Sequence, residues 1–278
     1  MTAPTNSDAN VNTPVPFYDA TYGRFYNGVY REIRRGVWGD DIGQNGWITA
    51  GEQDRFIRWC AVGPQHHLLD IACGSGGPTI RIAEQTRAAV TGVDVHSDGI
   101  AAAHHLAAER NIAASTTFVV HDAGQRLEFA DASFDAIICI DAINHLPDRP
   151  RVLADWWRVL RPGGRLLFTD PIVVTGLLTA EEIAVRASIG FFQFVPTETN
   201  PHMLGQAGFN LKACENVTPA VAEIAGRWHE QRRLRSVDLL QIEGETTYWG
   251  QQRFLETAAR LAGEGRLSRF AYFALKPE

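Results

Sequence analysis

The strongest constraint on the fold is a regular alternation of strand and helix patterns that begins after Gly63-Pro64. Apolar segments rich in β-branched residues read as strands: "HHLLDIA", "AAVTGVDV", "TTFVVHD", "FDAIICID" and "GRLLFTD". Helical segments separate most of them, including "GPTIRIAEQT" and "SDGIAAAHHLAAERN", the latter with Ser97 as its expected cap. Strands joined by helices of this length form a parallel sheet with helices on both faces. The sequence therefore predicts an α/β fold with a doubly wound, mostly parallel sheet.

The remaining chain divides around this core. Residues 1–16 are small and polar and are expected to form a disordered tail, whereas residues 17–62 are expected to form an N-terminal helical cap segment. The core is expected to comprise residues 63–217 and 265–278, with a helical insertion at 172–197. Residues 218–264 are expected to form a helical cap or dimer insertion. "FNLKACENV" and "LSRFAYFAL" are expected to bring the sheet to seven strands.

Composition excludes several classes of protein. A formal net charge of -6 over 278 residues argues against a surface that neutralises many phosphates, and the basic segment "QRRLR" is expected to be a solvated helix face. The four cysteines contain no C-x-x-C pair, which argues against a zinc knuckle or disulfide framework and favours a reducing cytoplasm. No signal pattern or bilayer-length apolar run is visible, so no membrane association is expected.

The segment "DIACGSGG", Asp70 to Gly77, is a glycine turn between the first strand and a helix. Such turns bring free backbone amides close to a ligand. Gly74 and Gly76 match two positions of the dinucleotide pattern G-x-G-x-x-G, but Thr79 stands at the third, and no Gly-Lys-Ser/Thr follows. A carboxylate at Asp70 would repel a pyrophosphate and attract an ammonium group. The turn therefore favours a cationic ligand over a phosphate.

Two further carboxylates end the following strands. Asp94 lies twenty residues after Gly74, where it can accept hydrogen bonds from both hydroxyls of a ribose. Asp122 ends the third strand and can accept one from an exocyclic adenine amine. An adenosine that carries an amino acid would supply a partner for each of the three carboxylates: an ammonium group, the ribose hydroxyls and the adenine amine.

The ordered motifs "LLDIACGSGG", "VTGVD", "HDA", "FDAIICIDAINHLPD" and "WRVLRPGGRLLFTDP" resemble those of class I S-adenosylmethionine-dependent methyltransferases over about residues 47–171. The flanking helical segments resemble the caps of small-molecule members, including sarcosine and phosphoethanolamine N-methyltransferases. The resemblance implies a seven-stranded Rossmann-like sheet, S-adenosylmethionine as cofactor and S-adenosylhomocysteine as product. It also implies in-line methyl transfer to an amine, hydroxyl or carbon nucleophile of a small molecule. Cofactor contacts are expected from Asp70, Ala72, Gly74, Ser75, Gly76, Asp94, Val95, Asp122, Ala123, Ile140, Asp141, Gln44 and Trp47.

The segment after the fourth strand faces the reactive methyl group in this family, which makes His145 the candidate general base. A histidine near its ordinary pKa suits that task at neutral pH; a structural role, or orientation of the substrate without proton transfer, is the alternative. The expected substrate residues are Tyr22, Asn144, His145 and Phe191, with Tyr18, Tyr26, Phe192 and Trp249 as further aromatic candidates. No metal is expected, because Pro171 follows Asp170 where the metal-dependent members carry an asparagine.

Three alternatives remain. The same cofactor site could serve another displacement, such as cyclisation of the cofactor's aminobutyryl chain, or the chain could bind the cofactor without catalysis. An NAD-dependent oxidoreductase is the third. The sequence leaves open whether N, O or C is methylated, and whether the protein is a homodimer.

Overall fold

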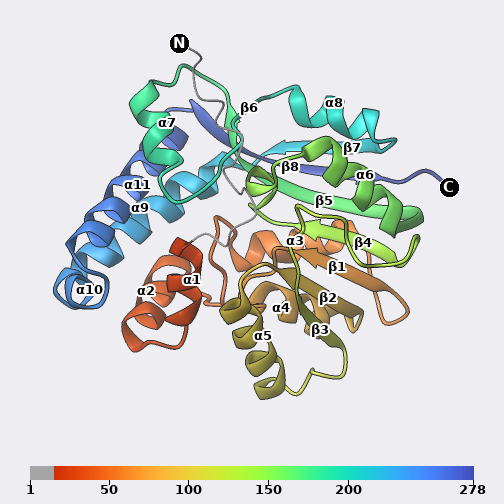
Figure 1. Cartoon of the computed structure of the whole chain (residues 1–278), viewed down its shortest axis with the longest axis horizontal. Helices are drawn as coiled ribbons and strands as arrows, with labels where there is room; N and C mark the ends of the chain where they lie inside the picture. The colour runs from red at the N-terminus through yellow and green to blue at the C-terminus, as the bar shows by residue number, and fades with distance from the viewer. Residues whose placement is uncertain (1–15) are drawn as a thin grey trace, which may run out of the picture.

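The computed structural model describes residues 16–278 and contains one central sheet (Figure 1). Its strand order is β3-β2-β1-β4-β5-β8-β7, with the short β6 paired to the end of β5. β8 is antiparallel to both of its neighbours, and the other pairs are parallel. The prediction of a mostly parallel seven-stranded sheet is confirmed, with β6 as an addition. The strands are β1 (His67–Ile71), β2 (Ala89–Asp94), β3 (Thr116–Val120), β4 (Phe134–Cys139), β5 (Leu160–Val174), β6 (Val195–Pro196), β7 (Asn210–Asn216) and β8 (Leu267–Leu275).

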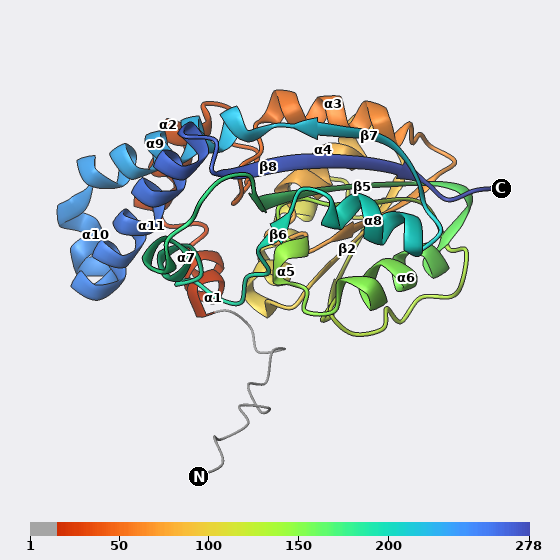
Figure 2. The same cartoon turned by 90° about the horizontal axis from the view of Figure 1, so that it is seen from above.

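Helices cover both faces of the sheet, with α3 on one side and α6 and α8 on the other (Figure 2). A second group, α1, α2, α7, α9, α10 and α11, lies beyond the carboxyl ends of the parallel strands (Figure 1). The helices are α1 (Pro16–Gly23), α2 (Gly28–Trp38), α3 (Ala50–Cys60), α4 (Gly77–Thr86), α5 (Ser97–Glu109), the 3-10 turn η1 (Ile143–His145), α6 (Arg149–Val159), α7 (Ala180–Arg186), α8 (Thr199–Gln206), α9 (Thr218–Leu234), α10 (Ser236–Glu243) and α11 (Glu245–Gly263).

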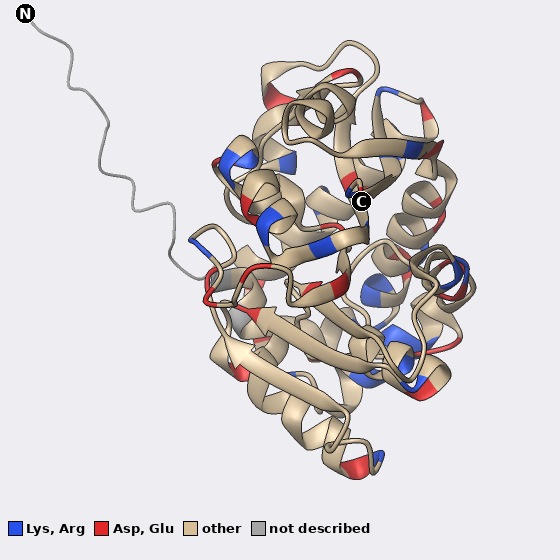
Figure 3. Cartoon of the chain, turned by 90° about the vertical axis from the view of Figure 1, so that its right-hand side faces the viewer, with Lys and Arg blue, Asp and Glu red and all other residues tan. Residues whose placement is uncertain are grey.

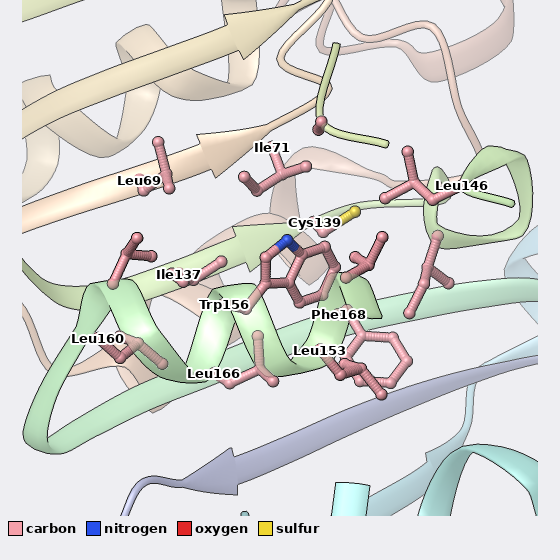
Figure 4. Packing of buried hydrophobic residues seen from close by; sticks show 14 of the residues in the cluster. Leu69, Ile71, Ile137, Cys139, Leu146, Leu153, Trp156, Leu160, Leu166 and Phe168 are labelled. Atoms are coloured by element: carbon pink, nitrogen blue, oxygen red, sulfur yellow. The ribbon is translucent and has the colours of Figure 1, made fainter. Parts of the chain in front are cut away.

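The main core forms where α6 packs on the sheet. Trp156 is fully buried against side chains of β1, β4 and β5, among them Leu69, Ile137 and Phe168 (Figure 4). The other buried residues of α6, Val152, Leu153 and Val159, lie on the same helical face. A buried tryptophan removes a large apolar area from water, so this contact holds α6 firmly against the sheet.

Local details differ from the sequence predictions. Ser97 does not cap α5: His96 is the N-cap residue, and its backbone N–H donates to Asp94 (2.9 Å). In the helical insertion expected at 172–197 only α7 is helical, and it ends at Arg186; the helical segment expected at 218–264 is divided into α9, α10 and α11. The helix α8 was not predicted. The expected tail 1–16 lies outside the described residues apart from residue 16.

The basic segment "QRRLR" is not simply a solvated face. Arg232 is buried and paired with Glu243 at 2.6 Å, whereas Arg233 and Arg235 pair with Glu230 and Glu32. Lys and Arg alternate with Asp and Glu over the side seen in Figure 3. The segment therefore offers little free positive charge. Among residues 16–278, no helix is long and apolar enough to cross a membrane.

Candidate active site

A cavity of about 1060 Å³ opens at the carboxyl ends of β1, β2, β3 and β4 and is covered by the N-terminal and late helices. Every residue expected to contact cofactor or substrate lines it except Gly76. Among the further aromatic candidates, Tyr18 and Phe192 line the cavity. Tyr26 and Trp249 do not, and their side chains are exposed.

The glycine turn has the tight backbone that its sequence predicts. Gly74 has a φ of +57°, and a Cβ atom there would lie 2.6 Å from the hydroxyl oxygen of Tyr22. Gly76 has a φ of +75° and precedes α4, where a Cβ atom would lie 2.5 Å from that of Ala103. Gly74 thus allows Tyr22 to approach the turn. Gly76 packs the turn against α5 and does not line the cavity, so the structure gives its expected ligand contact no support.

Asp70 ends β1 and is nearly fully buried at the cavity wall. Thr79 Oγ1 donates to its Oδ2 atom at 2.5 Å. Burial raises the pKa of Asp70 to about 7, against the Thr79 hydrogen bond, and the nearby charge of Asp94 raises it further. A carboxylate in this state gains a great deal from a cationic ligand, because the ligand supplies the missing counter-charge.

Asp94 ends β2 and organises the turn. Its Oδ2 atom accepts from the Gly74 amide at 2.8 Å, and its Oδ1 atom accepts from the amide of His96. The His96 ring also lies 2.8 Å from Oδ1 through Nδ1. A carboxylate has about four acceptor positions. These three contacts leave capacity for one hydroxyl, fewer than the two that the sequence interpretation assigned to a ribose.

Asp122 follows β3 and forms an Asx turn, its Oδ1 atom accepting from the Gly124 amide at 2.8 Å. This turn places the buried Ala123 at the cavity wall. Ile140 and Val95 add apolar surface to the same wall. The region offers a carboxylate beside apolar side chains, an arrangement suited to a flat base that carries an amine.

Asp141 is occupied by protein groups. Its Oδ2 atom accepts from the Trp47 amide at 2.8 Å, and its Oδ1 atom accepts from Arg269 at 2.6 Å and Thr169 at 2.7 Å. Gln44 is likewise used locally, because its side chain bonds the backbone of Ile42 and Asp40. Ser75 donates to the Gly43 carbonyl at 3.1 Å. These predicted cofactor residues line the cavity while they hold the loop over residues 40–48 against the sheet.

His145, at the end of η1, lies between Phe191 and Tyr18. Its Nδ1 atom is 2.9 Å from the Phe191 carbonyl oxygen, which only accepts, so Nδ1 carries the proton and Nε2 is an acceptor. The hydroxyl of Tyr18 lies 3.4 Å from Nε2. Burial lowers the pKa of His145 to about 4, against the Phe191 hydrogen bond. This differs from the ordinary pKa expected from sequence: His145 is neutral at physiological pH, and its Nε2 lone pair faces the Tyr18 hydroxyl at the cavity wall.

The predicted substrate residues Phe191 and Asn144 also line the cavity. Phe191 acts through its carbonyl, and its ring is 39% exposed. Asn144 is fully buried beside the cavity, and neither atom of its amide has a hydrogen-bond partner among residues 16–278. It is therefore available to a ligand.

Asp141, which follows β4, and Asp170, in β5, would be the natural ligands of a metal at this edge of the sheet, and both are paired with arginines. Asp170 lies 2.6 Å from Arg149 and accepts from Asn200 at 3.0 Å. Asp141 pairs with Arg269. In the described part of the chain, no group of three His, Cys, Asp or Glu side chains is placed to hold a metal ion.

The sequence interpretation missed the residues that the late helices bring to the cavity, above all Arg186, Trp228 and Phe254. Glu182 and Arg186 are four residues apart in α7, a spacing typical of an exposed ion pair. In the structure Glu182 pairs with Arg260 and Arg266 instead, and Arg186 is buried. The local sequence around Arg186 therefore carries no signal that this side chain lines the cavity.

The cavity fits S-adenosylmethionine. A buried, uncompensated carboxylate at Asp70 suits its ammonium group, Gly74 borders the same cavity, and Asp94 and Asp122 lie at the carboxyl ends of the neighbouring strands β2 and β3. The volume also leaves room for an acceptor beneath the late helices.

Comparisons with known proteins also point to S-adenosylmethionine as the cofactor. Residues 69–168 match the methyltransferase domain model. The O-methyltransferase resE of Aspergillus sclerotiorum is 36% identical over 70% of this chain and 70% of its own. The 27-O-demethylrifamycin SV methyltransferase of Amycolatopsis mediterranei is 29% identical over 76% of this chain and 80% of its own. The [4+2]-cyclase SpnF has the same fold, with a TM-score of 0.78 and 22% identity over 100% of this chain and 98% of its own.

The chain belongs to the class I S-adenosylmethionine-dependent methyltransferases. It is an enzyme that uses S-adenosylmethionine to methylate a small-molecule acceptor. Membership of this family identifies S-adenosylmethionine, not a nicotinamide dinucleotide or a phosphate, as the cofactor; the contacts that "DIACGSGG" makes with it stay a prediction.

Proposed function

We propose that this enzyme methylates a hydroxyl oxygen on an acceptor with an apolar ring or chain. The observation that carries this proposal is the neutral His145 at the cavity wall, whose Nδ1–H is held by the Phe191 carbonyl, which leaves Nε2, 3.4 Å from the Tyr18 hydroxyl, as a proton acceptor. The names of the relatives support it, because both relatives compared above are O-methyltransferases. Aromatic side chains from Trp47, Phe192 and Phe254 would surround the acceptor.

The chain's own residues would bind and orient the two reactants. We assign the cofactor's ammonium to Asp70, a ribose hydroxyl to Asp94 and the adenine edge to Asp122 and Ala123. Bound S-adenosylmethionine supplies a methyl group already activated by the positive sulfonium. The acceptor oxygen forms the new C–O bond as the C–S bond breaks, and the hydroxyl proton passes to Nε2 of His145 and then to water. Alignment of the nucleophile supplies most of the acceleration.

The location and assembly of the enzyme are further proposals. A cytoplasmic location is supported by the free cysteines, of which Cys60, Cys73 and Cys139 are buried. Paired arginines in "QRRLR" support a small-molecule acceptor over nucleic acid. Trp228, Thr247 and Phe254 line the cavity, which supports a capping role for residues 218–264 over a dimer insertion.

Product analysis tests the proposed reaction. Incubation with S-adenosylmethionine and a panel of hydroxylated acceptors should yield S-adenosylhomocysteine and a methyl ether in equal amounts. Turnover should be unchanged in a chelator, because Asp141 and Asp170 are already paired with arginines. Methylthioadenosine with a cyclic amino acid would instead indicate displacement within the cofactor. Cofactor binding with no turnover across the panel would indicate a non-catalytic protein.

Replacement of His145 tests its role. We expect His145→Ala to lower kcat about 100-fold with saturating cofactor, the lower end of what a positioned base contributes. The dissociation constant of S-adenosylhomocysteine should be unchanged. Because the pKa of His145 is lowered to about 4, its titration should leave the wild-type rate flat between pH 6 and 8. His105→Ala, an exposed histidine of α5, is the control. Near-normal turnover of His145→Ala would show that His145 is not the base.

A further inference from the structure

Arginines buried in the described part of the chain fall into two kinds. Four have at most 1% of their surface exposed. Three of these lie against carboxylates: Arg149 against Asp170, Arg232 against Glu243, and Arg269 against Asp141 and Glu52. Arg186 is the fourth, and it has no ion pair among residues 16–278. A buried charge without a partner is costly to the folded protein, so its retention at a cavity wall indicates a ligand.

Aromatic rings surround the guanidinium of Arg186, but two of its N–H groups have no hydrogen-bond acceptor within residues 16–278. Its Nε and Nη1 atoms are buried without a hydrogen-bond partner in the described residues. The guanidinium carbon lies 4.3 Å from the ring centroid of Phe254, 5.9 Å from that of Trp47 and 6.0 Å from that of Phe192. The face of an aromatic ring attracts a cation. The N–H groups point outward in the guanidinium plane, so ring contacts at this distance do not replace hydrogen-bond acceptors.

The position of Arg186 is held from the far end of its helix. Thr179 and Glu182 form a capping box at the start of α7, and Glu182 pairs with Arg266 at 2.7 Å and Arg260 at 2.9 Å. Arg186 is the last residue of this anchored helix and lines the cavity. Burial lowers its pKa to about 10, with Tyr18 acting in the opposite direction. The side chain therefore remains positively charged at neutral pH.

We propose that Arg186 binds a carboxylate on the methyl acceptor, whose apolar part lies against Phe254, Phe192 and Trp47. A planar carboxylate can accept two parallel hydrogen bonds from one edge of a guanidinium, either Nη2 with Nε or Nη2 with Nη1, and neutralise it. Each edge of Arg186 includes one of the two buried N–H groups that lack an acceptor among residues 16–278. Tyr18, His145 and Arg186 line the same cavity, and the Tyr18 hydroxyl lies 3.4 Å from Nε2 of His145. The acceptor would thus carry a hydroxyl toward His145 and a carboxylate toward Arg186. This assignment rests on the proposed function of the cavity as the acceptor site.

Binding of defined probes tests the charge preference. Calorimetry on protein saturated with S-adenosylhomocysteine would compare 4-hydroxybenzoate, 4-hydroxyphenylacetate and 3-(4-hydroxyphenyl)propionate with their primary amides. We expect at least one acid to bind about tenfold or more tighter than its amide, since a charge-assisted pair is lost in the amide. Arg186→Gln should abolish this preference without changing affinity for S-adenosylhomocysteine. Arg253→Gln, an exposed arginine of α11, should retain it. Equal affinity of acids and amides, failure of every acid to bind, or a preference that survives Arg186→Gln would overturn the proposal.

Stability of the ligand-free protein gives an independent test that needs no probe. Arg186→Met removes an unpaired buried charge and keeps most of the packing volume, so its Tm should equal or exceed that of the wild type. Arg232→Met removes an equally buried but paired arginine and should lower the Tm. A loss in Arg186→Met as large as that in Arg232→Met would show a structural role and contradict the assignment. Acid preference without any methyl transfer would instead refute the proposed function and leave the carboxylate site intact.

Discussion

Asp70→Asn is expected to weaken binding of S-adenosylhomocysteine by about 30- to 150-fold, equivalent to about 2–3 kcal/mol for a hydrogen bond to a charged group. Asparagine keeps the shape of the side chain and can still accept from Thr79, which donates at 2.5 Å in the structure. What it loses is the negative charge opposite the ammonium group. Isothermal titration calorimetry measures the change directly. Asp131→Asn, an exposed carboxylate paired with Arg158 outside the cavity, is the matched control.

The pH dependence of the same binding has a defined sign. The pKa of Asp70 is about 7 because burial disfavours its charge, and only the ionised form attracts the ammonium. Below pH 7 a proton must leave as the ligand binds, so the dissociation constant should rise about tenfold from pH 8 to pH 6. Asp70→Asn should show no such rise.

Stability measurements separate a binding defect from unfolding. Because the pKa of Asp70 is raised in the folded, ligand-free protein, the folded protein keeps a proton that the unfolded chain loses. Asp70 therefore lowers the free energy of unfolding as pH rises from the unfolded-state pKa to the folded-state pKa. Asp70→Asn removes that cost and should be at least as stable as the wild type at pH 8. Unchanged affinity in Asp70→Asn, with a pH dependence like that of the wild type, would rule out the assigned contact.

The sheet could be predicted from the sequence because its signals are local and repeated. Buried parallel strands such as β4 are continuous apolar runs, and helices such as α6 show a 3.6-residue period, so alternation alone restricts the topology. The end of α7 had no comparable signal. The placement of α7 depends on ion pairs of Glu182 with Arg260 of α11 and with Arg266, which precedes β8, and these pairs join residues far apart in the chain.

The cofactor side of the cavity was easier to predict than the acceptor side for a related reason. Asp70 and Asp94 lie in the last two residues of β1 and β2, and Asp122 follows β3, so sheet geometry brings them to one edge. Arg186 and Phe254 come from helices whose packing depends on tertiary contacts. The lowered pKa of His145 likewise depends on burial by the segment around Phe191, which no local pattern encodes.

Arg269→Met is expected to reduce the free energy of unfolding by about 3–5 kcal/mol, the usual cost when one partner of a buried ion pair is removed. Arg269 is fully buried and donates to Asp141 and Glu52, each at 2.6 Å. Burial alone would lower its pKa, but the two carboxylates outweigh burial and raise it. Urea unfolding measures the loss. Arg253→Met breaks only an exposed pair with Glu181 and should cost less than about 1 kcal/mol.

The cause of that loss can be separated from simple loss of packing. If the cost arises from stranded carboxylates, the triple variant Arg269→Met, Glu52→Gln and Asp141→Asn should recover most of it, since no unpaired charge then remains. The amide oxygen introduced by Asp141→Asn could still accept from the Trp47 backbone N–H, which Asp141 binds at 2.8 Å. The loop over residues 40–48 would then stay against the sheet. We therefore expect the triple variant to regain stability and also any affinity for S-adenosylhomocysteine that Arg269→Met loses. A triple variant no more stable than Arg269→Met would show that the arginine acts through packing, because the charges would then contribute nothing of their own.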